Sequence, residues 1–402
     1  MVPRGWKRIE LSELVVFKSG GTPSKQIGKY WGGEIPWLTA KDLKSFKLSD
    51  SVIKLTKEGM IAAQKIVPAN TILMLVRGMT LLKDLPIGVT TRDVTFNQDI
   101  KALVPKNGVD AYFLAYALVD NKERIRQNVT LAGHGTGRLE MDFLERVPLL
   151  IPPLSIQQKI SGVLGELDQI LSGFDRLVCA KVELKKGLMQ QLLAPIFCSN
   201  KQKVNAFRKF RLGDLFDERI ETNHNNLVLL SITADRGVVP RDELNRKDSS
   251  SEDKSKYKRI APGDIGYNTM RMWQGVSALS KLEGIVSPAY TVCTPNDLID
   301  GLFASYLFKY SPVVHLLHRH SQGMVDDTLS LKFPNFAQIK VVIPPIAEQK
   351  RIAAILSTLD REIELLKKSA DLFKQQKKGL MQKLLTGEVR VKAAVAEMEA
   401  TS

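Results

Sequence analysis

The sequence predicts an α+β protein in which two pseudo-symmetric mixed α/β domains are separated by two long coiled-coil helices. The first observation is an internal repeat: Ile151 and Ile343 both begin an Ile-Pro-Pro segment, and Gly187 and Gly379 both lie in a Lys-Lys-Gly-Leu-Met-Gln segment. Both pairs are 192 positions apart, so no insertion separates the copies. The second is a seven-residue apolar period in each copy. The third is that each copy follows a stretch of mixed strand-like and helix-like patterns. The chain is a duplicated unit.

The repeat also sets the expected boundaries. We expect a first domain at 1–150, a central helix at 151–195, a second domain at 196–342, a C-terminal helix at 343–388 and a tail at 389–402. Each helix of about 38 residues would be about 57 Å long at 1.5 Å per residue. This is far longer than an average globular helix.

The two heptad patterns predict a helix-helix seam. On the first helix the predicted seam residues are Ile160, Val163, Leu167, Ile170, Phe174, Leu177 and Leu184, and on the second they are Ile352, Leu356, Leu359, Ile363, Leu366 and Phe373. Gly162, Gly165 and Gly173 each weaken the first helix by about 1 kcal/mol relative to alanine. Such a helix needs a partner, and the second copy is the natural one.

Within each mixed domain, an aspartate begins an amphipathic helix at a matching place. Asp110 precedes Phe113 and Tyr116, and Asp300 precedes Phe303 and Tyr306. An aspartate at this position accepts a hydrogen bond from the first helical turn. We therefore expect two N-capped helices that are equivalent in the duplication.

The charge of the chain indicates what it binds. A formal net charge of +15 favours polyanionic partners, with nucleic acid first and anionic membrane second. No apolar run approaches the roughly 18 residues that span a bilayer, and the N-terminus lacks the apolar stretch of a signal peptide. The three cysteines have no Cys-x-x-Cys spacing. We therefore expect reduced thiols in a cytoplasmic protein.

Motifs of catalysis are absent from the sequence. It contains no phosphate-binding Gly-rich motif of the Walker or dinucleotide type, no His-Glu-x-x-His, no Gly-x-Ser-x-Gly and no Asn-Pro-Pro-aromatic tetrapeptide of an amino-methyltransferase. The loop at 133–138 is rich in glycine but lacks Walker spacing. His315, His318 and His320 cluster near a predicted helix end, where the helix dipole explains basic side chains without a metal. We expect no catalytic residue, no metal and no cofactor in this chain.

Binding of duplex DNA is therefore the main hypothesis. Arginine pairs with guanine, and asparagine or glutamine with adenine, although most basic side chains contact phosphates. The candidates in the first domain are Lys25, Lys29, Arg77, Asn97, Gln98, Arg124, Arg126, His134 and Arg138, and those in the second are Arg236, Arg241, Lys258, Arg271 and Arg319. Asn97 and Gln98 are chemically suited to adenine, but for these two a structural role is favoured over base contact.

The whole order of segments resembles the specificity subunit of type I restriction-modification systems. The resemblance rests on Gly20-Gly21-Thr22-Pro23-Ser24, Tyr30-Trp31 to Trp37, Asn97-Gln98-Asp99, and the run from Ile343-Pro344-Pro345 through Glu348-Gln349 to Gly379-Leu380-Met381-Gln382. The first copy departs from this pattern, because Ile156-Gln157 stands where Glu348-Gln349 stands in the second.

The resemblance implies a non-catalytic subunit. In that family two target recognition domains each read one part of a bipartite, asymmetric DNA site, and the two helices pack antiparallel as a ruler. The helices bind two modification subunits, which methylate adenine from S-adenosylmethionine, and restriction subunits add ATP- and Mg-dependent translocation and cleavage. None of these cofactors would be bound by this chain.

Two other functions are compatible with the same residues. One is a coiled-coil scaffold whose mixed domains bind proteins, with the basic charge incidental; its binding would be insensitive to salt. The other is an enzyme with an unrecognised site, which methyl transfer or DNA cleavage by the isolated chain would reveal.

Overall fold

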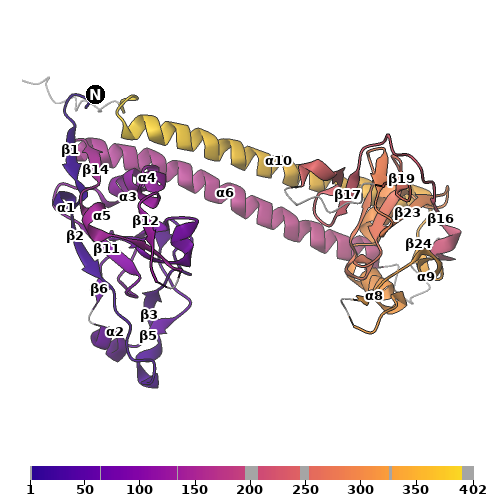
Figure 1. The fold of residues 1–402 in the computed structure, drawn as a ribbon, viewed down its shortest axis with the longest axis horizontal. Helices are drawn as coiled ribbons and strands as arrows, with labels where there is room; N and C mark the ends of the chain where they lie inside the picture. Colours follow the sequence, from indigo (N-terminus) through magenta and orange to yellow (C-terminus); the bar gives the residue numbers. More distant parts are fainter. Residues whose placement is uncertain are drawn as a thin grey trace, which may run out of the picture. The chain divides into compact units, whose positions relative to one another are not determined.

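The computed structural model describes residues 2–63, 65–133, 135–194, 207–244, 253–325 and 328–391. The chain forms two compact units: unit 1 is Met1–Gly173 with Ser369–Ser402, and unit 2 is Phe174–Lys368 (Figure 1). Each unit contains one mixed α/β domain together with part of both long helices. The predicted α+β class, with two related mixed domains and two long helices, is confirmed. The candidate His134 lies outside the described residues.

Unit 1 is built from four sheets. Their strand orders are β1-β14, β2-β11-β7-β9-β4, β5-β3-β10-β6 and β12-β13-β8. The strands are β1 (Lys7–Glu10), β2 (Val15–Ser19), β3 (Trp31–Leu38), β4 (Lys47–Leu48), β5 (Lys54–Leu55), β6 (Ile66–Val67), β7 (Ile72–Leu75), β8 (Arg77–Gly78), β9 (Ile87–Thr90), β10 (Val94–Phe96), β11 (Ile100–Pro105), β12 (Val129–Leu131), β13 (Gly137–Leu139) and β14 (Pro148–Ile151). The helices are α1 (Leu11–Leu14), η1 (Gly28–Tyr30), α2 (Lys57–Ala63), η2 (Met79–Leu82), α3 (Ala111–Asp120), α4 (Lys122–Arg126) and α5 (Met141–Glu145).

Unit 2 has a matching but smaller set of sheets. Their orders are β15-β24, β16-β23-β20-β21, β17-β18 and β19-β22. The strands are β15 (Arg208–Arg211), β16 (Phe216–Glu218), β17 (Leu230–Thr233), β18 (Gly237–Pro240), β19 (Lys258–Ile260), β20 (Ile265–Asn268), β21 (Ser277–Leu279), β22 (Gly284–Val286), β23 (Tyr290–Pro295) and β24 (Lys340–Ile343). The helices are η5 (Leu212–Asp214), η6 (Arg241–Glu243), η7 (Met272–Gln274), α7 (Gly301–Leu307), α8 (Ser311–His320) and α9 (Phe333–Ala337).

The duplication is visible in strand pairing. β1 pairs antiparallel with β14 just before the first long helix, and β15 pairs in the same way with β24 before the second. The order β2-β11-β7-β9 is repeated as β16-β23-β20-β21. The four residues of β7 are all buried. The predicted boundary at residue 150 falls inside β14.

The predicted N-caps are present in both units. The Asp110 carboxylate accepts a hydrogen bond from the Phe113 N–H at 2.7 Å, and Asp300 accepts one from the Phe303 N–H at 2.8 Å. Asn121 ends the helix after Asp110, and α4 follows it as a separate turn.

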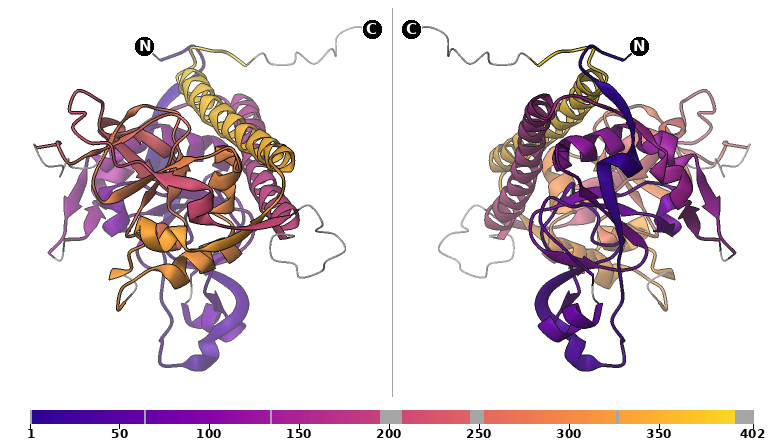
Figure 2. Two further views of the ribbon diagram at one scale, coloured as in Figure 1. Left: turned by 90° about the vertical axis from the view of Figure 1, so that its right-hand side faces the viewer. Right: turned by 90° about the vertical axis from the view of Figure 1, so that its left-hand side faces the viewer.

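The two long helices are α6 (Leu154–Leu193) and α10 (Ile346–Leu385), each of 40 residues. Both begin directly after a Pro-Pro pair, which suits a helix start because proline needs no N–H partner there. Within each unit they lie side by side and run in opposite directions (Figure 2). In unit 1 the early part of α6 meets the late part of α10, as the ion pair between Asp168 and Lys377 shows. In unit 2 the late part of α6 meets the early part of α10 through Lys185 and Asp360.

The seam on α10 agrees with the predicted positions. Ile352, Leu356, Leu359 and Ile363 are buried, and Leu366 and Phe373 are half-buried. These residues pack inside the unit to which each belongs. The sequence pattern on this helix therefore identified its inward face.

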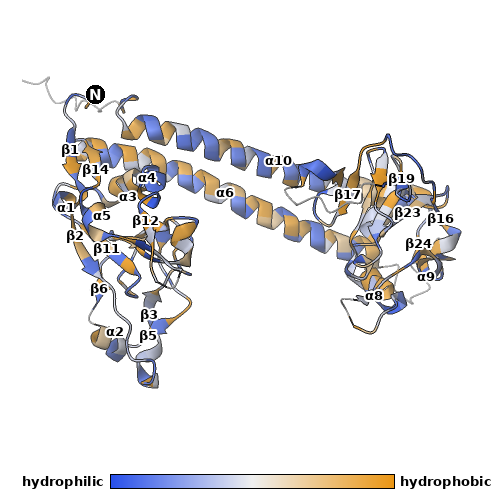
Figure 3. Cartoon of the chain, viewed as in Figure 1, coloured by the Kyte–Doolittle hydropathy of each residue, from blue (hydrophilic) through white to orange (hydrophobic). Residues whose placement is uncertain are grey.

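The seam on α6 differs from the prediction in one of its two rows. Ile160 is buried, and Val163, Leu167 and Phe174 are half-buried, but Ile170, Leu177 and Leu184 are 47, 52 and 47% exposed. The inward row lies one residue further on, at Leu164, Leu171, Val178 and Lys185. Both rows are largely apolar, and the inward one ends in a lysine, so hydrophobicity alone selected the wrong row. Figure 3 shows the resulting apolar residues along α6, whereas α10 is mostly polar.

Each unit has its own hydrophobic core that includes parts of both long helices. The core of unit 1 joins the buried sheet residues to Ile160 and Leu164 of α6 and to Met381, Leu384 and Leu385 of α10. The core of unit 2 joins Phe303 and Phe336 to Leu193 of α6 and Ile352 of α10. The helices are therefore structural parts of both units.

The end of α10 also meets the beginning of the chain. Gly387 has a φ of 72° and lies against Pro3 and Trp6, where a Cβ would be 2.7 Å from the Pro3 side chain. Glycine suits this position because it adopts a left-handed φ without strain and leaves room for the ring. The N-terminal segment and the end of α10 are thus packed together in unit 1.

Candidate nucleic-acid interface

The candidate basic residues of unit 1 fall into two groups according to their ion pairs. Lys29 is held by Glu58 at 3.0 Å, and Arg126 is held by Glu123 at 2.8 Å. Arg138 has a longer contact of 3.3 Å with Glu140. By contrast, the side chains of Lys25, Arg77 and Arg124 are exposed and make no hydrogen bond or ion pair within the described residues.

Arg77 and Arg138 lie on one small sheet. In the antiparallel ladders of β12, β13 and β8, Arg138 is opposite Arg77 on one side and opposite Thr130 on the other. The alternate residues of β13, Gly137 and Leu139, are buried, whereas Arg138 is exposed. The sheet therefore presents a threonine and two arginines on its solvent face.

Asn97 and Gln98 are part of a compact structural cluster. Asn97 is buried, donates from Nδ2 to Asp99 at 2.9 Å, and its Oδ1 has no partner among the described residues. Gln98 accepts a 2.6 Å hydrogen bond from the Thr22 hydroxyl. Gly20 lies against the Asn97 backbone so closely that a Cβ would be 2.1 Å from its carbonyl oxygen.

The same cluster includes two tryptophans of the aromatic segment. Trp37 donates from Nε1 to the Gly21 carbonyl at 2.9 Å, and Trp31 donates to the Ser24 carbonyl at 3.1 Å. The two rings meet edge to face with centroids 5.2 Å apart. The Gly-Gly-Thr-Pro-Ser, aromatic and Asn-Gln-Asp segments, which are far apart in sequence, thus support one another.

In unit 2 the candidate basic residues are again divided. Arg236 pairs with Glu243 at 2.8 Å, and Lys258 pairs with Glu218 at 3.2 Å in a largely buried position. Arg241 makes one long hydrogen bond of 3.3 Å to the Ser231 hydroxyl. Arg271 and Arg319 are exposed, and their side chains have no hydrogen-bond or ion-pair partner in the described part of the chain.

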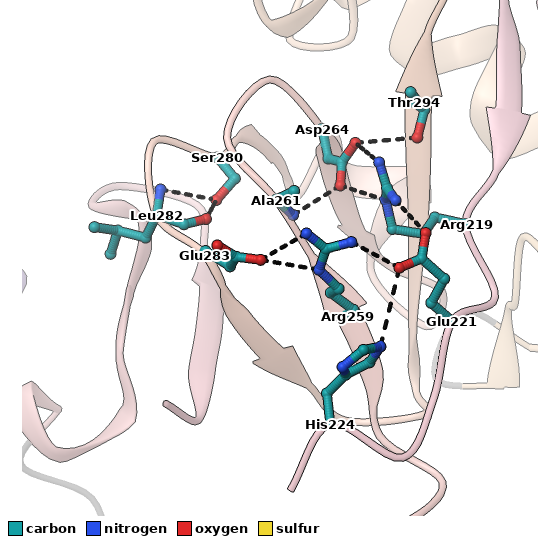
Figure 4. Close-up of polar contacts among 10 residues, drawn as sticks. All are labelled: Arg219, Glu221, His224, Arg259, Ala261, Asp264, Ser280, Leu282, Glu283 and Thr294. Carbon is teal, nitrogen blue, oxygen red and sulfur yellow. Dashed lines mark hydrogen bonds and ion pairs between the residues drawn. The ribbon is translucent and has the colours of Figure 1, made fainter. Parts of the chain in front are cut away.

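Sequence reasoning missed a charged network on one side of unit 2 (Figure 4). Arg219 contacts the nearly buried Asp264 at 2.8 Å and also Glu221. Arg259 joins Glu221 at 2.8 Å to Glu283 at 2.6 Å. The hydrogen bond from Arg259, followed by that from Arg219, lowers the pKa of Glu221. These arginines are committed to holding strands and coil segments together, so their charges are not free for a ligand.

Unit 2 also has a polar hollow of about 200 Å³. Its lining includes Arg241, Tyr257, Asn268 and Tyr290. These side chains offer hydrogen-bonding groups and ring edges but no pair of groups arranged for proton transfer. Among the described residues no group of three or more His, Cys, Asp or Glu side chains is placed to hold a metal ion. His320, one of the clustered histidines, contacts the Leu316 carbonyl at 2.9 Å through Nδ1.

The glutamine that follows each Pro-Pro pair is a buried clamp. Gln157 accepts from the Asp110 N–H at 2.9 Å and donates to the carbonyls of Gly108 and Pro152 at 3.1 and 2.9 Å. Gln349 repeats all three bonds with Asp300 at 2.9 Å, Leu298 at 3.0 Å and Pro344 at 2.8 Å. The clamp fixes the start of each long helix to the start of the capped helix of the same unit.

The neighbouring residue of the motif behaves differently in the two copies. Glu348 forms a surface ion pair with Arg351 at 2.6 Å, and Ile156 packs at the edge of the core of unit 1. The glutamine, and not the glutamate, therefore carries the shared structural role.

A tyrosine, an aspartate and a lysine form a second repeated contact, which we call the latch. In unit 1 the Tyr116 hydroxyl donates to Asp168 at 2.6 Å, Lys377 pairs with the same carboxylate, and the Lys377 Nζ lies 5.1 Å from the centre of the Tyr116 ring. Burial, reinforced by the hydrogen bond to Asp168, raises the pKa of Tyr116, so the phenol stays protonated and donates.

The latch of unit 2 has the same geometry with the helices exchanged. Tyr306 donates to Asp360 at 2.7 Å, Lys185 pairs with Asp360 at 2.5 Å, and the Lys185 Nζ lies 5.1 Å from the Tyr306 ring centre. In each unit, the tyrosine and aspartate come from one repeat and the lysine comes from the other. The latch therefore ties the two copies together.

The described residues include no helix that is both long enough and apolar enough to cross a bilayer. Cys179 is exposed and Cys293 is buried, and both are free thiols. Cys198 lies outside the described part of the chain.

Comparison with known proteins finds similarity to one kind of protein, the specificity subunit of type I restriction enzymes. A model of the type I restriction modification DNA specificity domain matches residues 3–176 and 207–372, one match for each repeat. The type I restriction enzyme MjaVIII specificity subunit of Methanocaldococcus jannaschii is 22% identical, over 97% of this chain and 94% of its own length. The EcoR124I/EcoR124II specificity subunit of Escherichia coli is 27% identical, over 45% of each chain, so the match spans about half of that relative.

Solved structures share the fold. The S subunit of a type I restriction-modification system from M. genitalium superposes with a TM-score of 0.58 at 15% identity and covers 96% of both chains. A chain from a structural study of complex assembly and conformational transition in a type I restriction-modification system has a TM-score of 0.57 at 14% identity, covering 97% of this chain and all of its own.

Proposed function

The chain belongs to the family of type I restriction-modification DNA specificity subunits, and from this premise we propose that it reads a bipartite, asymmetric site on duplex DNA. One domain reads each half, and the sequence between the halves is not read. The proposal rests on a comparison of the two units, which share their internal contacts but differ in their surface charges. Both units have the same clamp and latch, while their exposed arginines occupy different positions.

Charge supports DNA as the ligand. The net charge is +15, and Lys25, Arg77 and Arg124 in unit 1 and Arg271 and Arg319 in unit 2 are free of carboxylate partners within the described residues. An arginine already held by a carboxylate must lose that contact before it can bind phosphate, whereas a free one need not. These five residues are therefore the first candidates for DNA contact.

The proposed subunit is not itself an enzyme. The tyrosine and aspartate of each latch hold the two repeats together, and the charged network of unit 2 holds its strands together. Methylation would be performed by two modification subunits that carry S-adenosylmethionine, and cleavage by restriction subunits that use ATP and Mg. The complex would act in the cytoplasm, where its DNA substrate lies.

The test is to express the chain with its modification subunit in cells that lack other adenine methylation, and to map modified adenines by sequencing that detects them directly. The expected result is one motif with two specified halves and an unread gap, modified only when this chain is present. An uninterrupted motif, or modification that is independent of this chain, would rule the proposal out.

A further inference from the structure

Two arginines lie directly opposite each other on the exposed face of the sheet β12-β13-β8. Arg77 and Arg138 are register partners in an antiparallel ladder, and Thr130 is the partner of Arg138 on the other side. Residues paired in this way point to the same face of a sheet, with Cβ atoms about 4.5–5.5 Å apart. The sheet therefore carries a continuous row of Thr130, Arg138 and Arg77.

This row is unfavourable in the free chain. Like charges that face each other across two strands repel. Within the described residues the counter-charge is one contact, between Arg138 and Glu140 at 3.3 Å, in which both side chains are about half exposed. Arg77 has no side-chain partner in the described ranges. Arg259 of unit 2, by contrast, is neutralised by both Glu221 and Glu283.

The opposite face of the sheet holds the row in place. Gly137 packs so tightly that a Cβ would lie 3.0 Å from the side chains of Leu81 and Val129. Leu139 is buried, and its N–H donates to the Val76 carbonyl at 2.9 Å. The two arginines thus extend from a well-packed base that is joined to the end of β7, and only their outer parts are free to move.

We propose that the row Thr130, Arg138 and Arg77 binds the sugar-phosphate backbone of one strand of duplex DNA. The inference rests on the proposed function and deepens it by naming a contact surface. Guanidinium groups bind phosphate oxygens through two parallel N–H bonds. The Thr130 hydroxyl donates to the Arg138 carbonyl at 3.3 Å, and it adds a donor for phosphate when it gives up that long bond. A bound anion between the arginines also removes the repulsion that the free chain bears.

The row belongs to unit 1 only. The positions 192 residues after Thr130 and Arg138 are Gln322 and Ser330, which form the matching antiparallel bridge in unit 2. This bridge keeps the hairpin geometry but carries no charge. The two units therefore hold the DNA backbone differently, and the site on Arg77 and Arg138 positions unit 1 alone.

The experiment measures binding of the full-length chain to a random-sequence duplex of about three helical turns, at salt concentrations from about 50 to 200 mM. Arg77→Thr and Arg138→Thr should each make the plot of log affinity against log salt shallower by about 0.9, and weaken binding roughly eightfold at 0.1 M salt. Arg77→Lys, which keeps the charge, should retain the slope.

The control is Arg8→Ala, which removes the same charge from the same unit. Arg8 is exposed on β1, and Figure 1 shows β1 well away from β12. For Arg8→Ala, the slope of log affinity against log salt should match that of the unsubstituted chain. If the slope of log affinity against log salt were the same for Arg77→Thr as for this control, the proposed site would be overturned.

A second measurement is independent of DNA. Removing one arginine relieves repulsion, so Arg77→Thr should raise the melting temperature of the free chain by about 1 °C. A fall of several degrees would show that the arginines support the sheet and would overturn the inference. The proposed function fails separately, if the unsubstituted chain does not bind the duplex at all.

Discussion

At the scale of the residue, the two glutamine clamps are the most informative finding. Gln157 and Gln349 are buried, and each makes three hydrogen bonds to backbone groups of its own unit. The sequence holds a signal of this role, because the glutamine recurs at a spacing of 192 while its neighbour changes from isoleucine to glutamate. Pattern matching placed weight on the glutamate, which lies on the surface.

We predict that Gln157→Leu destabilises unit 1. The substitution leaves the Asp110 N–H and two carbonyl groups without partners in a buried site, at a cost of about 1–3 kcal/mol for an unsatisfied group. Chemical denaturation of the full chain should show a loss of about 3 kcal/mol. Gln158→Leu changes an exposed neighbour and should alter stability by less than about 0.5 kcal/mol. Equal stability of the two variants would contradict the clamp.

The network of unit 2 gives a prediction for pH. The pKa of Glu221 is lowered from its ordinary 4.5, first by Arg259 and then by Arg219. A carboxylate whose folded pKa is depressed stabilises the fold above its unfolded pKa, and this stabilisation is lost as the pH falls through the folded pKa. Glu221→Gln should therefore flatten the dependence of melting temperature on pH below about 4.5. Glu34→Gln, which removes an exposed carboxylate from unit 1, should leave it unchanged.

The residue contacts that could be predicted are the local ones. Asp110 and Asp300 were identified as caps because a cap and its N–H partner are three residues apart. Arg259 and Glu221 are 38 residues apart, and Lys377 and Asp168 are 209 apart, so nothing in the local pattern connects them. The division of candidate arginines into held and free ones depends on such distant partners. The DNA contacts themselves remain predictions.

At the scale of the element, the long helices were predicted closely. The expected ranges of 151–195 and 343–388 contain the observed α6 and α10, because the Pro-Pro pairs and the closing repeat mark both ends. The inward face of α6 was only half identified. Its inward row includes Lys185, whose charge is neutralised by Asp360, and a hydrophobic pattern gives such a position no weight.

The antiparallel register of the helices makes a prediction about the unread gap. Inserting seven residues after Gly173 in α6 and seven after Lys368 in α10 keeps the heptad pattern and lets both latches form. The gap between the two recognised halves should then lengthen by about three base pairs, because seven helical residues add about 10.5 Å. Methylation mapping provides the measurement.

Insertion into α6 alone is the matched control. It leaves one latch out of register, so we expect loss of activity or stability without a new, longer gap. If the double insertion left the gap unchanged, the helices would not determine the spacing of the halves.

At the scale of the whole molecule, the exchange of lysines between the repeats has a consequence for a half-length chain. A fragment that ends near Pro195 contains Asp168 and Lys185 but lacks Lys377. Because Lys185 and Lys377 are equivalent in the repeat, a second copy can supply the missing lysine. We predict that this fragment forms a homodimer and directs methylation to a symmetric site.

Charge exchange tests the dimer directly. Asp168→Lys in the fragment should weaken dimerisation in analytical ultracentrifugation, and adding Lys185→Asp should restore it because each pair then has the opposite polarity. A fragment that is folded and strictly monomeric would contradict helix pairing between the copies. So would a double variant no better than the single one.

The duplication and fold class could be read from the sequence because the repeat is in register throughout its helical part. Which segments of the chain make up each compact unit could not be read from the sequence. Domain boundaries were placed at the ends of the helices, whereas each compact unit takes the first half of one helix and the last half of the other. This assignment depends on residues more than 200 positions apart that share one core, such as Ile160 and Leu384 in unit 1.

The discontinuity of unit 1 also fixes an order of events during synthesis. Unit 2 is one continuous segment that ends at Lys368, so it is translated before α10 is complete. Unit 1 starts earlier in the chain but lacks Met381, Leu384 and the contact of Gly387 with Pro3 until the end of α10 has been translated. The unit whose translation begins first is therefore completed last, and a nascent chain stalled before α10 ends lacks the side chains that cover this part of the core of unit 1.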